Sequence, residues 1–563
     1  MWNRSLSRWV AGWSAALLLS VSVVSIASEP NRAAAVDAVF APLRGNDRPG
    51  AAVGIYQGGK LVYSQGYGMA NLDAGTPITA DTVFNLASVS KQFTAVSAAL
   101  LAREGKLDLQ ADIRKYLPNQ PDLGTRITVA DLIHHTSGIR DYIALAALSG
   151  HDDQSLIRQR HAIAILERQR GLNFQPGTRY AYSNSGYALL AEVVQAAAGK
   201  SLNEFMKERL FKPLGMNDTR VRDDLSRIEP GYAAGYERGE EAGRPWARAV
   251  YNRVAVGPGN VLSTVGDLAK WAGNFAHPVV GDAQFIEQLS APAALRDGTP
   301  VNYGFGLTRQ EVIGHRVVTH TGGISGFRTV FVFFPDDDFA VVVLANHSYN
   351  FEPAVEQIAK IYLQPKAVKA PKKPASITPK ATVLAGLAGT YLGSEGPMLT
   401  VRQDGTQLIF AAEGHDQGAA KFWADGTFTV GDRDSTRYRA AQQQGATVGI
   451  DVIGKSNDGE RVQRLARVSP FTPAASELAT LTGVYYGEEI DTSYSVSIDA
   501  GKVTLRSLYL DAPQALQPTT RDRFEAQDGA LEGLEVTVVR NSAGQPTGLR
   551  LRFGSTATLL AKR

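Results

Sequence analysis

Residues 84–91 read Phe84-Asn85-Leu86-Ala87-Ser88-Val89-Ser90-Lys91, and a helix is predicted over about residues 89–104. Ser88 and Lys91 are three residues apart at the start of this helix, so the two side chains share a face. A serine hydroxyl is a weak nucleophile, and a lysine held among apolar groups can have its pKa lowered enough to accept the hydroxyl proton. Free N–H groups at the helix start can stabilise an oxyanion. Because Ser-x-x-Lys also occurs by chance, its interpretation depends on the rest of the chain.

A second element, Tyr182-Ser183-Asn184, lies in a loop before an apolar helix predicted over 186–198. A phenol close to a cationic lysine can be held as phenolate or act as a proton relay. Asn184 can hydrogen-bond both Lys91 and a substrate amide. The structural alternatives are a helix N-cap for Asn184 and core packing for Tyr182.

A third element, His320-Thr321-Gly322-Gly323, ends an apolar strand. A strand edge offers N–H and C=O groups to an extended substrate, and the two glycines allow a close approach. Thr321 can hold a carboxylate or carbonyl, and His320 can act as a cation or a proton donor whose charge changes near neutral pH. The alternative is an ordinary bulge with a core histidine.

The three elements, in this order, resemble those of the serine β-lactamase and penicillin-binding protein superfamily. The similarity is closest to the branch that holds class C β-lactamases, D-alanyl-D-alanine carboxypeptidases, D-aminopeptidases and related esterases. It covers about residues 32–365. Further stretches that match are Leu132–Ile139, Gly257–Gly259, Leu262–Leu268, Tyr303–Gly306 and His320–Phe327.

The resemblance implies acyl transfer through an ester on Ser88, with Lys91 and Tyr182 sharing the general-base role. Which of the two takes the first proton is left open. The N–H groups of Ser88 and Gly323 would form the oxyanion hole, while Asn184, His320, Thr321 and Gly322 would orient substrate. Class C β-lactamases have lysine where this chain has His320, so a carboxypeptidase, aminopeptidase or esterase is favoured over a β-lactamase.

Composition excludes several classes of protein. The chain has 563 residues, of which 44% are hydrophobic, and a formal charge of +3. A balance so near neutral argues against a nucleic-acid binder. With no cysteine, the chain has no disulfide, thiolate nucleophile or iron–sulfur cluster. Its nine histidines include no His-Glu-x-x-His spacing, so we expect neither metal nor cofactor.

The N-terminus has the pattern of a secretory signal peptide over residues 1–27. Arg4 and Arg8 supply positive charge, an apolar run follows, and Ser25-Ile26-Ala27 offers a cleavage site. An uncleaved membrane anchor is the alternative. We therefore expect an exported, periplasmic or secreted protein that is not inserted in a membrane after cleavage.

Strands predicted near both ends of residues 28–364, with helices between them, indicate an α/β domain with an antiparallel sheet flanked by helices and an all-helical lobe. Residues 365–382 are rich in proline and lysine and are predicted to be a linker, with a basic binding patch as the alternative. Two all-β units, 383–470 and 475–563, follow. Their first residues repeat the pattern Leu-x-x-Leu-x-Gly-x-Tyr-x-Gly, from Leu384 and again from Leu478.

Short strands with glycine turns predict two small β-barrels, and this architecture is similar to that of bacterial D-aminopeptidases with lipocalin-like barrels. The favoured function is an exported serine peptidase or amidase for short D-amino-acid peptides. Alternatives are a carboxylic-ester hydrolase, a β-lactamase and a non-enzymatic penicillin-binding sensor or scaffold. The barrels either stabilise the protein or place a loop at the active site. Candidates for that loop are residues 487–491 and 507–511, whose acidic groups could attract a substrate amine.

Overall fold

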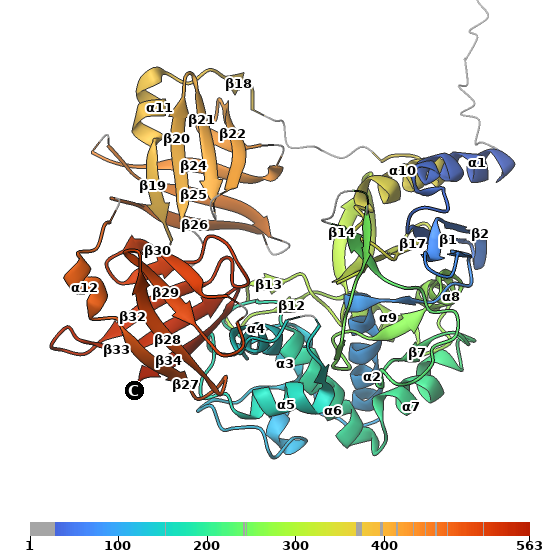
Figure 1. Cartoon of the computed structure of the whole chain (residues 1–563). Coiled ribbons are helices and arrows are strands. Elements are labelled where there is room, and N and C mark those ends of the chain that lie inside the picture. The colour runs from blue at the N-terminus through green and yellow to red at the C-terminus, as the bar shows by residue number, and fades with distance from the viewer. Residues whose placement is uncertain are drawn as a thin grey trace, which may run out of the picture.

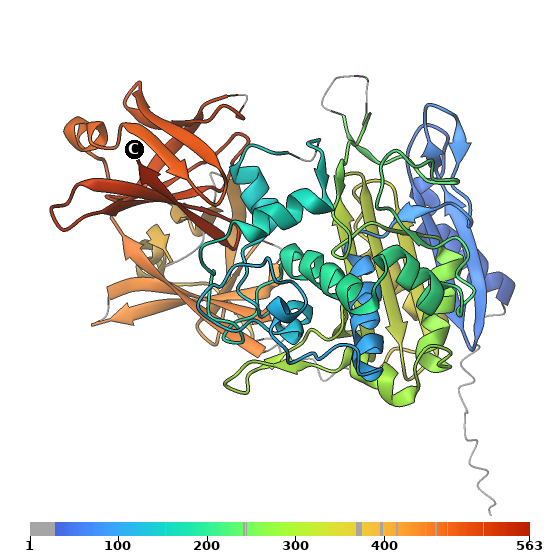
Figure 2. The same cartoon turned by 90° about the horizontal axis from the view of Figure 1, so that it is seen from below.

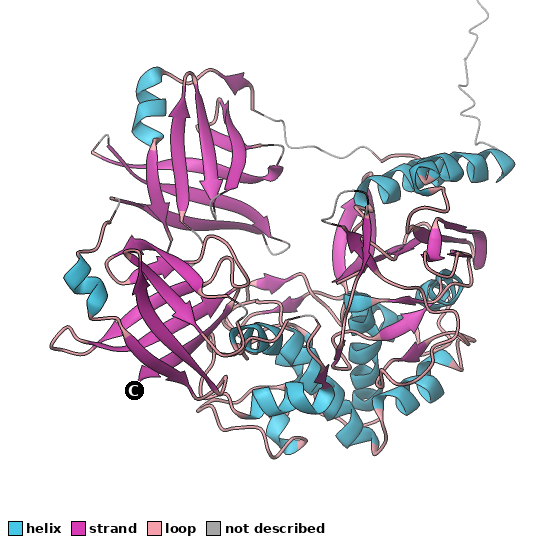
Figure 3. Ribbon diagram, in the orientation of Figure 1, coloured by secondary structure: helices cyan, strands magenta, loops and turns pink. Residues whose placement is uncertain are grey.

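The computed structural model describes residues 29–563 except 153, 240–242, 244, 367–373, 394–397, 413–414, 432, 445, 457–458, 470 and 511. One α/β domain is followed by two β-barrels, and strands predominate in the barrels (Figures 1 and 3). The predicted signal peptide lies outside the described residues, as do residues 367–373 of the predicted linker. Within the described part of the chain, no helix is long and apolar enough to span a membrane.

The α/β domain is built on a six-stranded sheet in the order β14-β15-β16-β17-β1-β2, with every neighbouring pair antiparallel. Strands from both ends of the domain meet at its centre, where Ala51 of β1 lies opposite Ala345 of β17. The predicted antiparallel sheet is therefore confirmed. The strands are β1 (Ala51–Gln57), β2 (Lys60–Tyr67), β14 (Thr308–Val312), β15 (His315–Ile324), β16 (Phe327–Phe334) and β17 (Phe339–Ala345).

Helices cover both faces of this sheet. Side chains alternate along a strand, so Val53 and Ile55 pack in the cluster that contains α1 (Glu29–Val39) and α10 (Glu352–Tyr362). Ala52 points the other way, into the cluster that contains α8 (Val265–Ala276). A Cβ on Gly54 would lie 2.8 Å from the Val265 side chain, so the approach of α8 to the sheet needs glycine at this position.

The helical lobe surrounds α2, which is buried from Lys91 to Leu101. The helix predicted over 186–198 is present and begins two residues earlier at Asn184, and the helix predicted over about 89–104 begins at Lys91, whereas no helix was predicted over 142–148, 265–276 or 283–290. The lobe and its surroundings contain α2 (Lys91–Arg103), α3 (Val129–Ile133), α4 (Tyr142–Leu148), α5 (Gln159–Glu167), α6 (Asn184–Ala198), α7 (Leu202–Met206) and α9 (Ala283–Ser290), with the short 3-10 helices η2 (Ala87–Ser90) and η3 (Ile113–Lys115) and the π-helix η4 (Lys207–Phe211). Another 3-10 helix, η1 (Ala41–Leu43), follows α1 on the other side of the sheet.

Short strands link these parts. They are β3 (Met69–Asn71), β4 (Thr76–Pro77), β5 (Phe84–Asn85), β6 (Ile157–Arg158), β7 (Arg220–Val221), β8 (Tyr236–Arg238), β9 (Trp246–Arg248), β10 (Arg253–Val254), β11 (Val261–Ser263), β12 (Ala293–Ala294) and β13 (Pro300–Val301). The pairing of β5 with β11 matters most for the site, because it fixes the residues just before Ser88.

Both predicted barrels are present, each as a closed ring of eight strands. The first ring is closed by pairing of β22 with β23, and the second by pairing of β27 with β34. The first contains β19 (Gly389–Leu392), β20 (Leu399–Asp404), β21 (Gln407–Ala412), β22 (His415–Trp423), β23 (Thr427–Val430), β24 (Arg433–Gln443), β25 (Ala446–Ser456) and β26 (Gly459–Val468). The second contains β27 (Gly483–Gly487), β28 (Thr492–Asp499), β29 (Lys502–Arg506), β30 (Gln514–Thr520), β31 (Arg523–Glu525), β32 (Glu535–Arg540), β33 (Pro546–Phe553) and β34 (Thr556–Lys562).

The last part of the predicted linker has regular structure. β18 (Ser376–Ile377) pairs with the edge of β22, and α11 (Ala381–Leu387) begins before residue 382. A matching helix, α12 (Ala475–Ala479), precedes the second barrel. The domain boundaries given above stay predictions.

The sequence repeat has a structural cause. In the first copy the buried Tyr391 donates a hydrogen bond from its hydroxyl to the Leu387 carbonyl at 2.7 Å. In the second copy Tyr485 makes the same bond to Leu481 at 2.8 Å. The repeated leucines and tyrosines therefore attach a short helix to the first strand of each barrel, and the repeat needs no catalytic explanation.

The second barrel packs directly on the helical lobe (Figures 1 and 2). Its buried residues join those of the lobe in one continuous apolar cluster. Tyr494 donates a hydrogen bond to the Leu148 carbonyl at 2.5 Å, and Ser149 donates one to the Ile490 carbonyl at 3.0 Å. The barrel and the lobe thus share a core, and the site described next lies beside their junction.

Candidate active site

Ser88 lies in η2, immediately before α2. The preceding residue, Ala87, has a φ of 48°, a left-handed conformation that is uncommon for a residue with a side chain. Its N–H is held by the Asn85 side chain at 2.9 Å, and the N–H of Leu86 donates to the Val261 carbonyl at 2.9 Å. These bonds hold the strained turn that leaves Ser88 partly exposed while its neighbours Ala87 and Val89 are buried.

Lys91 is fully buried, and its amine has three hydrogen-bond partners. The Nζ atom lies 3.2 Å from Ser88 Oγ, 2.9 Å from Asn184 Oδ1 and 2.9 Å from the Pro258 carbonyl oxygen. Neither the Asn184 oxygen nor the Pro258 carbonyl can donate a proton. A neutral amine therefore directs its two N–H bonds to these oxygens and its lone pair to Ser88.

Burial lowers the pKa of Lys91 from 10.5 to about 7, and the negative charge of Asp141 opposes this effect. A large share of Lys91 is therefore neutral at physiological pH. The lowered pKa expected from the sequence is present, and its geometry allows Lys91 to accept the Ser88 proton.

Tyr182 lies between the Lys91 amine and the solvent. The Lys91 amine lies 4.7 Å from the centroid of the Tyr182 ring, and 37% of Tyr182 is exposed. Packing around the hydroxyl raises the pKa of Tyr182 above its ordinary value, although its hydrogen bond with Ser88 opposes the rise. The phenolate, one of the two states expected from the sequence, is thus disfavoured, because desolvation outweighs the effect of the hydrogen bond with Ser88. A neutral phenol remains able to relay or donate a proton.

Asn184 is the first residue of α6, and its side chain reaches Lys91 instead of capping the helix. The cap comes from Asp141, whose Oδ2 accepts from the Asn184 N–H at 2.6 Å and from the Ser183 hydroxyl at 3.4 Å. Asp141 therefore holds Asn184 in place and supplies the negative charge that opposes the lowering of the Lys91 pKa. Asp141 was not predicted as a site residue, because no motif in the sequence connects residues 43 positions apart.

The strand β15 passes close to Ser88. A Cβ on Gly322 would lie 2.3 Å from the Leu86 carbonyl oxygen and 2.2 Å from Thr329 Oγ1, which itself donates to that oxygen at 2.8 Å. Residues 320–324 pair with β16 on one side, while β14 pairs only as far as Thr319 among the described residues. Thr321 and Gly323 are exposed. This open edge is suited to an extended substrate.

His320 differs from its predicted role as a cation. It is buried, and its Nδ1 lies 2.6 Å from the Thr321 carbonyl oxygen and its Nε2 lies 2.9 Å from the Tyr303 hydroxyl. Because a carbonyl only accepts, Nδ1 carries the proton and Nε2 accepts from Tyr303. Burial and the nearby Lys91 charge lower the pKa of His320 to about 3. His320 is therefore neutral at physiological pH and its charge does not change near neutrality.

His135 is a second residue whose role was not predicted. Its backbone is left-handed, with a φ of 59°, and the centroid of its ring lies 4.3 Å from that of Tyr182, with the two rings tilted by 38°. Its Nδ1 accepts from the Ser183 N–H at 3.1 Å. The ring thus positions the Tyr182–Asn184 segment from behind. The sequence signal was the matched segment Leu132–Ile139, in which no role had been assigned to His135.

The structure brings all of the predicted site residues together: Ser88, Lys91, Tyr182, Asn184, His320, Thr321, Gly322 and Gly323. Within the described part of the chain, no group of three His, Asp or Glu side chains is arranged to hold a metal ion. The site can perform nucleophilic acyl transfer with proton transfer by Lys91 and Tyr182. The roles of the individual residues stay predictions.

Comparisons with known proteins identify the family of the chain. The family profile described as Beta-lactamase matches residues 36–364. A D-aminopeptidase of Gluconobacter oxydans (strain 621H) is 30% identical over 465 residues, which cover 81% of this chain and 82% of the relative. A D-aminopeptidase of Cereibacter sphaeroides is 27% identical over 536 residues, which cover 92% of this chain and 96% of the relative.

Among solved structures, the octameric penicillin-binding protein homologue from Pyrococcus abyssi is similar, with a TM-score of 0.53 and 23% identity. The match covers 77% of this chain and 99% of that chain. It supports the fold of the α/β domain. Since the family match spans more than half of the chain and includes the site from Ser88 to Gly323, the chain belongs to the Beta-lactamase family and is a serine hydrolase.

Proposed function

We propose that the protein is an exported peptidase or amidase that hydrolyses short peptides containing D-amino acids through an acyl-enzyme on Ser88. The observation that carries the chemistry is the buried Lys91 amine, 3.2 Å from Ser88 Oγ and with a pKa lowered to about 7. The substrate class is supported by the two relatives named D-aminopeptidase, one of which aligns over 92% of this chain, barrels included.

Acylation begins when Ser88 Oγ attacks the substrate carbonyl carbon and Lys91 takes the hydroxyl proton. The new C–O bond places negative charge on the carbonyl oxygen, where the N–H groups of Ser88 and Gly323 can stabilise it. The C–N bond then breaks. Tyr182 gives its proton to the leaving amine and regains one from Lys91, so the pair ends neutral and Ser88 carries the acyl group.

Deacylation reverses these proton transfers with water as the nucleophile. Water attacks the ester carbon, its proton passes to the Lys91–Tyr182 pair, and the bond to Ser88 breaks as the serine oxygen regains a proton. The neutral His320 adds no positive charge to the substrate edge. This supports a peptidase over a β-lactamase, in which the family has lysine at that position.

The test compares purified parent protein, Ser88→Ala and Ser90→Ala. Ser90 is a matched control, because its buried hydroxyl accepts the Val261 N–H at 3.0 Å and is committed to structure. We expect a fluorescent phosphonate to label the parent and Ser90→Ala, and to leave Ser88→Ala unlabelled. Labelling that persists in folded Ser88→Ala would rule out the mechanism.

Substrates decide the class of the enzyme. D- and L-aminoacyl p-nitroanilides, nitrophenyl esters and a chromogenic cephalosporin are offered in parallel. We expect turnover of the D-anilides well above that of the L-anilides. Turnover of esters alone would make the protein an esterase, and rapid cephalosporin turnover would make it a β-lactamase.

A further inference from the structure

The second barrel contacts the helical lobe through residues 487–491, the first of the two candidate loops. Glu489 is buried and accepts from the Arg140 guanidinium, from the Arg170 N–H at 2.7 Å and from the Thr558 hydroxyl at 2.6 Å. Glu488 pairs with Arg170 at 3.2 Å. Glu489 is therefore neutralised within the junction and cannot attract a substrate amine, whereas Glu488 is exposed and the expectation for it stays untested.

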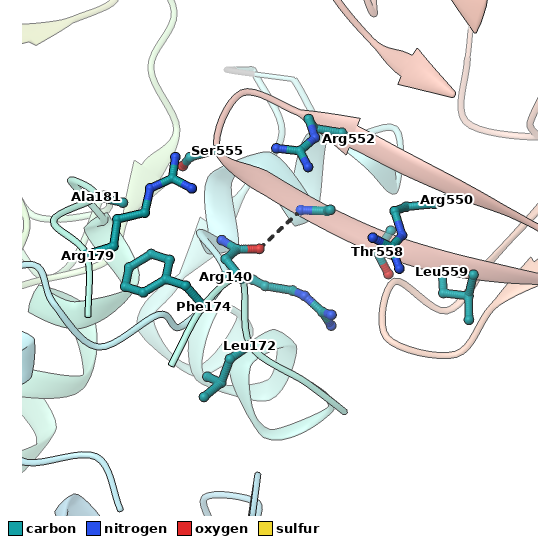
Figure 4. A pocket seen from close by; sticks show the side chains of 12 residues that line it. Arg140, Leu172, Phe174, Arg179, Ala181, Arg550, Arg552, Ser555, Thr558 and Leu559 are labelled. Carbon is teal, nitrogen blue, oxygen red and sulfur yellow. Dashed lines mark hydrogen bonds between the residues drawn. The ribbon is translucent and has the colours of Figure 1, made fainter. Parts of the chain in front are cut away.

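A cavity of about 300 Å³ lies between the lobe and the barrel, next to these contacts. One wall comes from the hairpin formed by β33 and β34, with Arg550 and Arg552. The other comes from the lobe, with Arg140, Phe174 and Arg179 (Figure 4). The Asn173 side chain accepts from the Ala557 N–H at 3.3 Å and joins the two walls. The cavity is therefore a product of the two domains together.

The cavity carries positive charge. Four arginines line it, and none of its described lining residues is acidic. Glu489 offsets the charge of Arg140 and Glu535 lies 3.9 Å from Arg552, whereas Arg550 has no acidic partner among the described residues. Arg550 even lowers the pKa of Arg140, a mutual repulsion that adds to the effect of burial. The Arg140 Nε–H is buried and has no partner among the described residues. An anion in the cavity would offset the repulsion between Arg140 and Arg550 and could accept a hydrogen bond from the Arg140 Nε–H.

The cavity adjoins the catalytic groups. Ala181 lines it, and the next residue, Tyr182, covers Lys91. Arg140 lines it, and the next residue, Asp141, holds Asn184. The Thr556 hydroxyl, beyond the hairpin turn, accepts the Asp141 N–H at 2.9 Å. The cavity therefore lies beside the segments that carry Tyr182 and Asp141, and arginines of both domains line it.

The geometry points to a carboxylate-binding subsite in this cavity, with Arg550 and Arg140 holding the free C-terminus of the peptide's leaving group. This inference rests on the proposed function, since it assigns the part of the substrate beyond the scissile bond. The subsite would bind short peptides with a free C-terminus more tightly than the corresponding amides. The C-terminal carboxylate is the anionic group that all such peptides share.

The test separates binding from turnover. D-Ala-Gly, D-Ala-Gly-Gly and their C-terminal amides are titrated calorimetrically into full-length Ser88→Ala, in which no acyl-enzyme can form. Charge-assisted hydrogen bonds of this kind support about a tenfold or greater difference in Kd between acid and amide. We expect Arg550→Ala to remove that difference and Arg550→Lys to keep part of it. Arg506→Ala, an exposed arginine on β29 of the same barrel, is the control and should keep all of it.

Equal Kd values for acids and amides, or no measurable binding of the acids, would overturn the subsite. Inorganic phosphate is titrated as a second probe. Phosphate that binds in an Arg550-dependent manner and competes with the acids supports the subsite, whereas binding without competition would make the cavity a separate anion site and overturn the assignment. Turnover of the D-aminoacyl p-nitroanilides tests the proposed function separately, because these substrates lack a carboxylate and do not need the subsite.

Discussion

Replacing Lys91 by methionine tests two effects of the lysine separately: its contribution to the rate of acylation and its effect on the free energy of unfolding. Methionine matches the length of the lysine stem and carries no charge. Lys91 is fully buried and its pKa falls from 10.5 to about 7, so the folded protein disfavours the charged amine. We expect Lys91→Met to lose acylation and, below neutral pH, to escape the penalty of burying that charge.

The size of the effect follows from the two pKa values. Below pH 7 both the folded and the unfolded chain hold the proton, and burial of the ammonium costs about 4 to 5 kcal/mol. Between pH 7 and 10.5 only the unfolded chain binds it, so the parent's free energy of unfolding rises with pH, by about 2.3 kcal/mol from pH 7 to 9. Lys91→Met lacks this rise. Its unpaired Asn184 and Pro258 oxygens add a loss of about 1–3 kcal/mol each that does not depend on pH.

Urea unfolding of the parent and Lys91→Met at pH values from 6 to 9.5 measures this difference, with fluorescence of the α/β domain as the signal. Lys212→Met is the control, because Lys212 is exposed in the same domain and should reproduce the parent's profile. A difference between parent and Lys91→Met that stays constant across this range would refute the lowered pKa, and with it the argument that Lys91 is the base.

Three further predictions concern the neighbours of Lys91. Tyr182→Phe should slow acylation by about 10²–10⁴-fold, and combining it with Lys91→Ala should cost less than the two separate losses together, whereas fully additive losses would place Tyr182 outside the proton path. Asp141→Asn removes the charge that raises the Lys91 pKa, so the acid limb of the acylation rate should move to lower pH; an unchanged or higher midpoint would contradict this. Gly322→Ala should lower both stability and labelling, because its Cβ would lie 2.3 Å from the Leu86 carbonyl, while Gly454→Ala, where a Cβ meets nothing within 4 Å, should leave labelling unchanged.

The architecture was largely predictable because its signals are local. Apolar strands such as Phe339–Leu344 and the repeat from Leu384 and Leu478 are visible in short windows. The missed helix α8 shows the limit. Its N-cap, Thr264, accepts from the Asp267 N–H at 3.2 Å, a start signal present in the sequence but interpreted only as a family match. The ends of helices shifted because turns such as η2 interrupt a continuous apolar pattern.

The site was predictable where one residue performs one chemical step. Ser88 and Lys91 are recognisable from spacing, and Gly322 from the need for close approach. The protonation states of the site residues were not predictable, because they depend on how deeply each side chain is buried, and the spacing of residues in the sequence does not show burial. His320 lies among Tyr303, Tyr182 and Lys91, which come from three separate parts of the chain. Only the folded protein shows that this histidine is neutral.

The second barrel also takes part in holding the catalytic groups. Thr556 accepts the Asp141 N–H, Asp141 accepts the Asn184 N–H, and Asn184 accepts from the Lys91 amine, so one chain of hydrogen bonds runs from the barrel hairpin to the base. Each bond also fixes the orientation of the next donor. Because the barrel and the lobe share one apolar cluster, this chain has no independent hinge within it. The barrel is therefore better understood as part of the catalytic scaffold than as an appendage, and the proposed carboxylate subsite at the junction belongs to the same scaffold.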